Sequence, residues 1–225
     1  MAEEPSQKSA RILRVDEMGL AAAVEEAARS LCSGGLVVFP ASGLYGLGAD
    51  GENPAAVERV FAAKARTPGM PLLVLVAENR DAERLASRLP PAARALMDAL
   101  WPGGVTLVLP ASNQVAPRLT GDTGKIGVRR PAQPVALALC RALGRPLVGT
   151  SANLSGRPGC REISRLDPEI LAAADLILDA GPLTGQASTV VDTTVSPPVI
   201  LREGAVPGKK ILEILGQKEK TVPPL

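Results

Sequence analysis

The chain has 225 residues, of which 46% are hydrophobic, so it is long and apolar enough to fold around one full core. With 25 basic and 23 acidic residues its net charge is +2, which argues against binding nucleic acid through bulk charge alone. The sequence contains no histidine, and this excludes Ser-His-Asp and Cys-His catalysis and every zinc site that uses imidazole.

The sequence shows no pattern typical of targeting or of a membrane span. Residues 30–49 are uncharged, but glycine, serine and proline interrupt them too often to cross a bilayer. The N-terminus lacks a basic region followed by an apolar core, so no signal peptide is expected. Cys32, Cys140 and Cys160 are far apart and fit no metal-binding spacing, which indicates reduced thiols. We therefore expect a cytoplasmic protein without a membrane partner.

Predicted helices and short apolar strands alternate along the first half of the chain. Residues 1–10 have the polar composition of a flexible tail. Asn53 followed by Pro54 indicates a sharp helix start, because asparagine caps a helix and proline suits its first turn. The predicted elements are a helix over 16–31, a strand over 36–39, a loop over 40–48, a helix from 54 to about 64, a strand over 71–76, helices over 79–87 and 91–100, and a strand over 105–109.

The second half continues this alternation and then places three strands close together. The predicted elements are a polar loop over 110–124, a strand over 126–129, a helix over 133–143, a strand over 146–150, a loop over 154–163, a helix from 168, strands over 176–178, 188–192 and 199–202, and a helix over 209–216. No internal repeat or linker divides the chain. The pattern predicts a single α/β domain with a twisted, mixed sheet and flanking helices.

Small and hydroxylated residues directly follow one of the predicted strands. The stretch 149–156, Gly-Thr-Ser-Ala-Asn-Leu-Ser-Gly, comes after the apolar run 146–148. Ligands of α/β proteins bind beyond the carboxyl ends of strands, and small residues with neutral donors let a backbone approach an anion. Serine, asparagine and glycine are also turn formers, so the stretch by itself favours a turn.

Lys64 and Arg66 lie where a predicted helix ends. Once the helix has ended, the two cations can converge on one anion, since arginine forks onto phosphate oxygens and lysine supplies a mobile charge. Taken alone, however, basic residues in a last helical turn are ordinary, because they favour the helix dipole.

Two further cations end predicted strands. Arg129 should face the same side as Gly127, and Arg202 ends the strand over 199–202. Ser188 opens another strand, and a strand-end hydroxyl beside strand-end guanidiniums favours an anion site. Neither a GxxxxGK[ST] loop nor a GxGxxG turn after the first strand is present, so a nucleotide would need an unusual site.

Taken together, these stretches resemble the YrdC-like family, the threonylcarbamoyl-AMP synthases of tRNA modification. The matching pieces follow the family's order and cover roughly residues 11–206. They are Phe39-Pro40 through Tyr45-Gly46-Leu47-Gly48, Lys64-Ala65-Arg66, Pro71-Leu72, Trp101-Pro102-Gly103 with Thr106-Leu107-Val108-Leu109, Gly127-Val128-Arg129-Arg130-Pro131, Thr150 to Gly156, Ser188-Thr189-Val190-Val191-Asp192, and Ile200-Leu201-Arg202. Eight motifs in register are highly specific.

The resemblance implies a fold and a reaction. The expected organisation is a flexible tail over 1–10, a YrdC-like domain over 11–206 around a positively lined cavity, and a C-terminal helix and tail over 207–225. The implied enzyme is a nucleotidyltransferase that forms threonylcarbamoyl-adenylate and pyrophosphate from L-threonine, bicarbonate or CO2, and ATP, with Mg2+ assisting. Its product serves the t6A modification of tRNA, so tRNA or tRNA-modifying transferase proteins are the expected partners.

The family's functional residues map onto positions of this sequence. The resemblance assigns Lys64 and Arg66 to catalysis, and it implies no protein ligand for a metal. Arg129 would bind the carboxylate of threonine. The implied nucleotide-binding residues are Lys64, Arg66, Lys125, Ser151, Asn153 and Arg202, and the implied substrate-binding residues are Tyr45, Arg129 and Ser188.

Several positions depart from the family pattern, mainly on the amino-acid side. A family threonine that binds the amino acid falls on Gly43, and family asparagine, histidine and serine positions fall on Met70, Leu75 and Gly159. Two alternatives therefore stay open. One is a paralogue that acts on a different small amine or acid, and the other is a YciO-type protein that binds nucleotide or RNA without catalysis. The retained Lys64, Arg66, Ser151 and Asn153 argue against the second.

Overall fold

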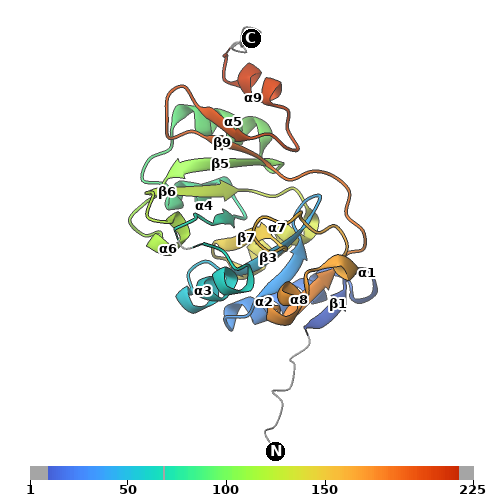
Figure 1. The fold of residues 1–225 in the computed structure, drawn as a ribbon. Helices are drawn as coiled ribbons and strands as arrows, with labels where there is room; N and C mark the ends of the chain where they lie inside the picture. Colours follow the sequence, from blue (N-terminus) through green and yellow to red (C-terminus); the bar gives the residue numbers. More distant parts are fainter. Residues whose placement is uncertain (1–9, 68, 218–225) are drawn as a thin grey trace, which may run out of the picture.

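A ten-stranded mixed sheet runs through the computed structural model, which describes residues 10–67 and 69–217 (Figure 1). In chain order the strands are β1 (Arg11–Arg14), β2 (Val37–Pro40), β3 (Tyr45–Asp50), β4 (Leu73–Leu75), β5 (Val105–Pro110), β6 (Lys125–Arg129), β7 (Leu147–Ser151), β8 (Leu176–Asp179), β9 (Thr189–Asp192) and β10 (Val199–Arg202). Their order in space is β1-β8-β2-β3-β7-β4-β6-β5-β9-β10. Because β5 pairs in parallel with β9 and antiparallel with β6, the predicted mixed sheet is confirmed.

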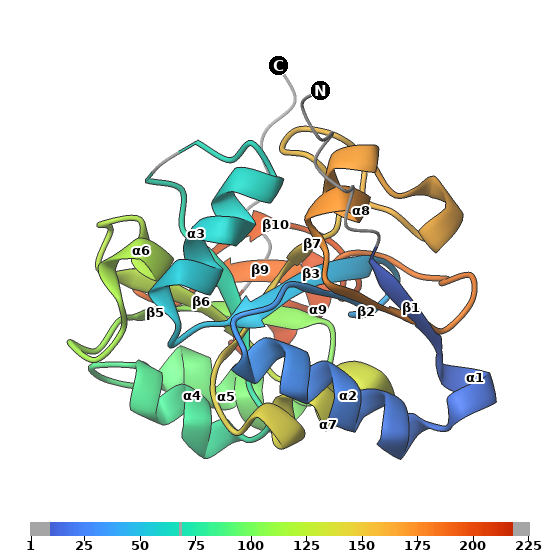
Figure 2. The same ribbon diagram turned by 90° about the horizontal axis from the view of Figure 1, so that it is seen from below.

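Helices flank the sheet, as predicted, and they cover both of its faces. In chain order they are α1 (Val15–Met18), α2 (Leu20–Cys32), α3 (Pro54–Ala63), α4 (Asn79–Leu85), α5 (Pro91–Leu100), α6 (Pro117–Thr120), α7 (Pro134–Leu143), α8 (Pro168–Ala173) and α9 (Gly208–Ile214). Figure 2 shows α2, α4, α5 and α7 along one face and α3, α6 and α8 over the other.

Apolar cores on the two faces hold the helices against the sheet. On one face, Leu31 of α2 and Leu139 of α7 are buried in a cluster with Phe39 of β2. On the other, Phe61 of α3 belongs to a cluster that includes Leu47 of β3. Each buried side chain of this size contributes about 1.5–3 kcal/mol relative to an exposed one, so the sheet is anchored from both sides.

The predicted loop over 40–48 is wrong in its second half. Tyr45–Asp50 form β3 and pair with β2 in a hairpin. Glycine is needed here for packing, because a Cβ at Gly48 would lie 2.7 Å from a ring carbon of Phe39. The glycines of β3 therefore allow close packing within a strand. Because glycine is more typical of loops, the composition of this segment did not predict the strand.

The predicted helix over 16–31 is divided in two. Helix α1 ends at Met18 and α2 begins at Leu20, with Gly19 between them at φ +81°. Glycine adopts this left-handed conformation without the steric cost that other residues meet, so the helix breaks there. Within the predicted loop over 110–124, the short helix α6 was not anticipated.

The ends of the chain agree with the prediction in part. Residues 11–14 form the edge strand β1, which was not predicted, and Ala10 of the predicted tail is buried. Helix α9 is the predicted C-terminal helix. Residues 1–9 and 218–225 of the predicted tails lie outside the described residues. Across 10–67 and 69–217, none of the helices combines the length and apolar character that a bilayer span requires.

Candidate active site

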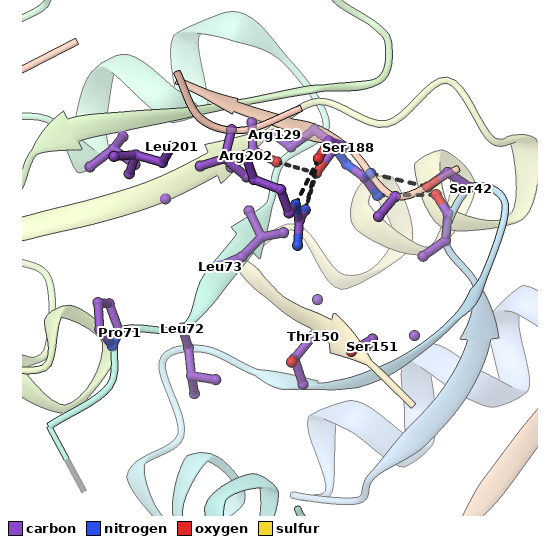
Figure 3. Close-up of a pocket in the computed structure, with 18 of the residues that line it drawn as sticks. Ser42, Pro71, Leu72, Leu73, Arg129, Thr150, Ser151, Ser188, Leu201 and Arg202 are labelled. Carbon is purple, nitrogen blue, oxygen red and sulfur yellow. Dashed lines mark hydrogen bonds between the residues drawn. The ribbon is translucent and has the colours of Figure 1, made fainter. Parts of the chain in front are cut away.

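A cavity of about 580 Å³ opens on one face of the sheet and is lined by residues of β3, β4, β5, β6, β7, β9 and β10 and of nearby loops (Figure 3). Four of the side chains that line it are cationic: Arg66, Lys125, Arg129 and Arg202. Of the described residues, Asp192 is the one carboxylate in the lining. A concave surface with this excess of positive charge attracts an anionic ligand.

Alternation along the strands brings these side chains to one face of the sheet. On β6, Lys125, Gly127 and Arg129 line the cavity at every second position, which agrees with the shared facing predicted for Arg129 and Gly127. On β5, Thr106 and Val108 do the same. The pleat of the sheet therefore carries much of the site, and loops complete it.

Arg129 is the most deeply buried of the lining cations, with 3% of its surface exposed. Its guanidinium donates hydrogen bonds to Ser42 Oγ at 3.2 Å and to the Ala41 carbonyl at 3.1 Å, while its Nε has no hydrogen-bond partner. Burial, reinforced by repulsion from Arg202, lowers the pKa of Arg129 to about 10. Among the described residues no carboxylate pairs with it, so it presents an uncompensated charge to a ligand.

Arg202 and Ser188 form a second polar group at the same end of the cavity. Arg202 donates from Nε and Nη2 to the Ser188 carbonyl at 3.1 and 2.8 Å, and Ser188 Oγ lies 2.8 Å from Thr106 Oγ1. Figure 3 shows Arg129 directed toward Ser42 and Arg202 toward Ser188. The predicted residues Arg129, Ser188 and Arg202 are thus brought together.

Arg66 reaches the cavity from the end of α3. The helix ends at Ala63, and Ala65 then adopts a left-handed φ of +45°, which turns the chain. Arg66 lines the cavity, donates to the Pro71 carbonyl at 2.7 Å, and keeps a buried Nε without a partner. Burial lowers the pKa of Arg66, and a bound anion would offset this cost by favouring the charged guanidinium.

Contrary to the predicted convergence of the two cations, Lys64 does not line the cavity beside Arg66. It is 2% exposed, and its Nζ donates to the carbonyl oxygens of Ser151 and Asn153 in the turn after β7. Its own carbonyl accepts from the Ser155 N–H at 3.0 Å. Burial, followed by repulsion from Arg66, lowers the pKa of Lys64 to about 8. Lys64 therefore braces the turn, and its assignment to the nucleotide stays a prediction.

Ser151 and Asn153 lie in the same turn but in different surroundings. Ser151 lines the cavity, together with Thr150. Asn153 is 6% exposed, and its side-chain nitrogen donates to the carbonyls of Leu154 and Arg157, both at 2.7 Å. The buried Oδ1 of Asn153 has no partner. The geometry gives Ser151 direct access to a ligand and gives Asn153 a role in shaping the turn.

Two predicted residues have their polar groups occupied. Lys125 forms a 2.9 Å ion pair with Asp192. Although burial acts in the opposite direction, hydrogen bonds from Thr194 and Lys125 hold the pKa of Asp192 below its usual value. Tyr45 is among the lining residues, but its hydroxyl donates to the Gly181 carbonyl at 2.8 Å. Burial raises the pKa of Tyr45 to about 12.

Sequence reasoning missed five polar residues of the cavity as site residues: Ser42, Thr106, Thr123, Thr150 and Asp192. Thr106 stands out as the one hydroxylated residue in an apolar run, and this signal could have identified it. Ser42 lies in a segment that departs from the family pattern, so the resemblance offered no guide to it. In residues 10–67 and 69–217, no group of three or more His, Cys, Asp or Glu residues could hold a metal ion.

Comparison with known proteins gives relatives over most of the chain. The family model for Sua5, YciO and YrdC proteins, described as "Telomere recombination", matches residues 29–204. A threonylcarbamoyl-AMP synthase of Pyrococcus abyssi is 38% identical over 192 residues, which cover 85% of this chain and 56% of the relative. The synthase of Bacillus subtilis is 35% identical over 195 residues, 86% of this chain and 56% of the relative. This chain thus spans about half the length of these two proteins.

Shorter relatives and solved structures agree with this match. A threonylcarbamoyl-AMP synthase of Stenotrophomonas maltophilia is 39% identical over 159 residues, 69% of this chain and 85% of the relative. The structure of P. abyssi Sua5 complexed with L-threonine superposes with a TM-score of 0.85 at 36% identity, covering 92% of this chain and 61% of that one. The structure of Escherichia coli YciO superposes with a TM-score of 0.77 at 28% identity, covering 90% of this chain and 98% of that one. This chain therefore belongs to the Sua5/YciO/YrdC family.

Proposed function

We propose that this chain is a threonylcarbamoyl-AMP synthase, a nucleotidyltransferase that makes threonylcarbamoyl-adenylate for the t6A modification of tRNA. The observation that carries the proposal is the buried Arg129, whose charge has no carboxylate partner among the described residues and faces a cavity lined by three further cations. Relatives named threonylcarbamoyl-AMP synthase, at 35–39% identity, support the assignment.

The amino acid would bind at the end of the cavity that contains Arg129. The guanidinium can fork onto the carboxylate of L-threonine, and the hydroxyls of Ser42, Thr106 and Ser188 lie around it. In a buried site of this kind, a carboxylate partner relieves the cost of keeping the arginine charged away from water. The carboxylate of the substrate would therefore neutralise the buried charge of Arg129.

ATP would occupy the remaining part of the cavity. Arg66 and Lys125 supply positive charge for the phosphates, Arg202 would meet them from the amino-acid end, and Ser151 supplies a hydroxyl. Lys64 and Asn153 would act by holding the turn that presents Ser151. The lining's single described carboxylate, Asp192, is already paired with Lys125, so the residues fit Mg2+ that arrives on the ATP phosphates better than a resident metal.

The reaction requires positioning and charge stabilisation more than a protein base, which suits a chain without histidine. The threonine amine and CO2 first give a carbamate. A carbamate oxygen then attacks the α-phosphorus of ATP, the bond from that phosphorus to the bridging oxygen breaks, and pyrophosphate leaves. Cations at the phosphates stabilise the charge that develops on the phosphoryl oxygens and on the leaving group.

A second candidate is a paralogue that acts on a different small amine, or that binds nucleotide or RNA without turnover. Gly43 and Leu75 favour it, because neither supplies a polar group to the amino acid. The similarity to E. coli YciO covers 98% of that chain and is consistent with it. For the synthase, tRNA or a tRNA-modifying transferase would be the downstream partner.

The test is pyrophosphate release by the purified chain with ATP, Mg2+ and bicarbonate, measured with and without L-threonine. We expect release that depends on threonine and on bicarbonate. The matched control is Arg66→Ala, which should weaken ATP binding while leaving the melting temperature unchanged, since Arg66 is only half-buried. Nucleotide binding without threonine-dependent release would favour the paralogue, and an amino-acid panel would follow.

A further inference from the structure

The connection between β8 and β9, residues 180–187, is fixed by hydrogen bonds along its length and reaches the cavity at Ala187. At its start the Tyr45 hydroxyl accepts from the Ala180 N–H at 3.0 Å and donates to the Gly181 carbonyl at 2.8 Å. Further along, the Leu183 N–H bonds the Arg161 carbonyl at 2.9 Å. The end of the connection is held by a 2.8 Å bond from the Ala205 N–H to the Ala187 carbonyl.

The connection crosses the loop 41–44 with backbone against backbone. A Cβ built at Gly43 would lie 2.3 Å from the carbonyl carbon of Gly185 and 2.6 Å from the nitrogen of Gln186. From the other side, a Cβ at Gly185 would lie 3.3 Å from the Gly43 Cα. No flexible side chain can give way at this crossing, so any residue other than glycine at position 43 must push the connection outward.

Both segments that cross hold residues of the site. The loop 41–44 supplies the Ala41 carbonyl and Ser42 Oγ that bind Arg129. The connection leads directly into Ser188, whose backbone and hydroxyl bind Arg202. The crossing therefore packs the loop that holds Arg129 against the connection that leads to Ser188 and Arg202.

We propose that Gly43 is a specificity-determining position of the amino-acid end of the cavity. Its missing side chain lets the connection 180–187 lie against the loop 41–44, and this contact sets the position of Ser188 relative to Arg129. Gly43 itself does not line the cavity, so it acts through these neighbours and not by touching the substrate. The inference deepens the proposed function, and its kinetic part rests on that function.

The test compares Gly43→Ala with Gly181→Ala in the full chain. Position 181 lies in the same connection and has φ +73°, but a Cβ there meets nothing within 4 Å, so it disturbs the backbone without a clash at the crossing. Hydrogen exchange of the amides over 182–188 should be about tenfold faster in Gly43→Ala than in the wild type, and nearly unchanged in Gly181→Ala. The KM for threonine should rise about tenfold in Gly43→Ala while the KM for ATP changes little.

The outcomes separate the inference from the proposed function. If the wild type shows no threonine-dependent release of pyrophosphate, the proposed function fails. The exchange measurement needs no substrate, so it still tests whether Gly43 holds the connection 180–187 in place. Unchanged exchange in Gly43→Ala, or equal changes in both KM values, overturns the inference. If Gly43→Ala does not fold, Gly185→Ala replaces it, because its Cβ contact with the Gly43 Cα is 3.3 Å and should shift exchange and KM in the same direction. Gly185 lies at φ +123°, so the added backbone strain is controlled by Gly181→Ala, which also introduces a side chain at positive φ but meets nothing within 4 Å.

Discussion

Lys64 and Arg66 are two residues apart in the sequence but serve different parts of the site. Lys64 donates to the carbonyls of Ser151 and Asn153, whereas Arg66 lines the cavity and donates to the Pro71 carbonyl. The left-handed Ala65 between them turns the chain at the end of α3. The lysine thus shapes the turn after β7, and the arginine faces the ligand.

The charge of Lys64 should respond to nucleotide binding. Burial, together with Arg66, lowers the pKa of Lys64 to about 8, so the free protein loses this proton as pH rises through 8. A bound triphosphate favours the charged ammonium and raises the pKa, so ATP binding at about pH 8.5 should take up a fraction of a proton. Calorimetry in two buffers of different ionisation enthalpy measures this uptake. Equal heats in both buffers would show that Lys64 is not coupled to the phosphates.

Replacing Arg129 should separate binding from stability. Arg129→Met should raise the KM for threonine by about a hundredfold, since a lost charged hydrogen-bonding partner costs about 3 kcal/mol. The melting temperature should stay the same or rise, because an unpaired buried charge is removed. The matched control is Arg130→Met, whose side chain bonds Asn79 and does not line the cavity. Similar kinetic losses in both variants would argue against a direct role for Arg129.

Tyr45→Phe tests whether the tyrosine hydroxyl serves structure or substrate. The hydroxyl is engaged with Ala180 and Gly181, so its loss should reduce the free energy of unfolding by about 1–3 kcal/mol. Urea denaturation gives this value. A loss of threonine affinity without any loss of stability would instead assign the hydroxyl to the substrate.

Trp101 is expected to be a principal support of the core beneath β5. It is 8% exposed, and its Nε1 donates to the Val105 carbonyl at 2.7 Å. Trp101→Ala should lower the free energy of unfolding by about 3–5 kcal/mol, because a large cavity is left. Trp101→Phe keeps most of the packing, so it should lower the free energy of unfolding by less than the alanine variant does. An unchanged melting temperature for the alanine variant would contradict the burial.

Local signals in the sequence predicted many elements but not their pairing. Asn53 caps α3 as expected, with its Oδ1 accepting from the N–H groups of Ala55 and Ala56. Alternation likewise predicted that Arg129 and Gly127 share one face. The contact between Thr106 and Ser188 could not be predicted, because it depends on the parallel pairing of β5 with β9 across about eighty residues of chain.

Glycine marks the other limit of sequence reasoning. The glycines of β3 suggested a loop, although Gly48 is required by contact with Phe39. The crossing of Gly43 and Gly185 is invisible in the sequence, since nothing local shows that two distant backbones meet. Where a missing side chain makes room for another segment, the reason lies in tertiary packing and not in local conformational preference.

Direct detection of the product by mass spectrometry tests the central claim most directly. The purified chain would be incubated with ATP, Mg2+, bicarbonate labelled with carbon-13, and L-threonine, and the adenylate analysed at once. We predict threonylcarbamoyl-adenylate that carries the label and is absent when threonine, bicarbonate or ATP is omitted. ATP binding with no labelled adenylate in the complete mixture would contradict the account.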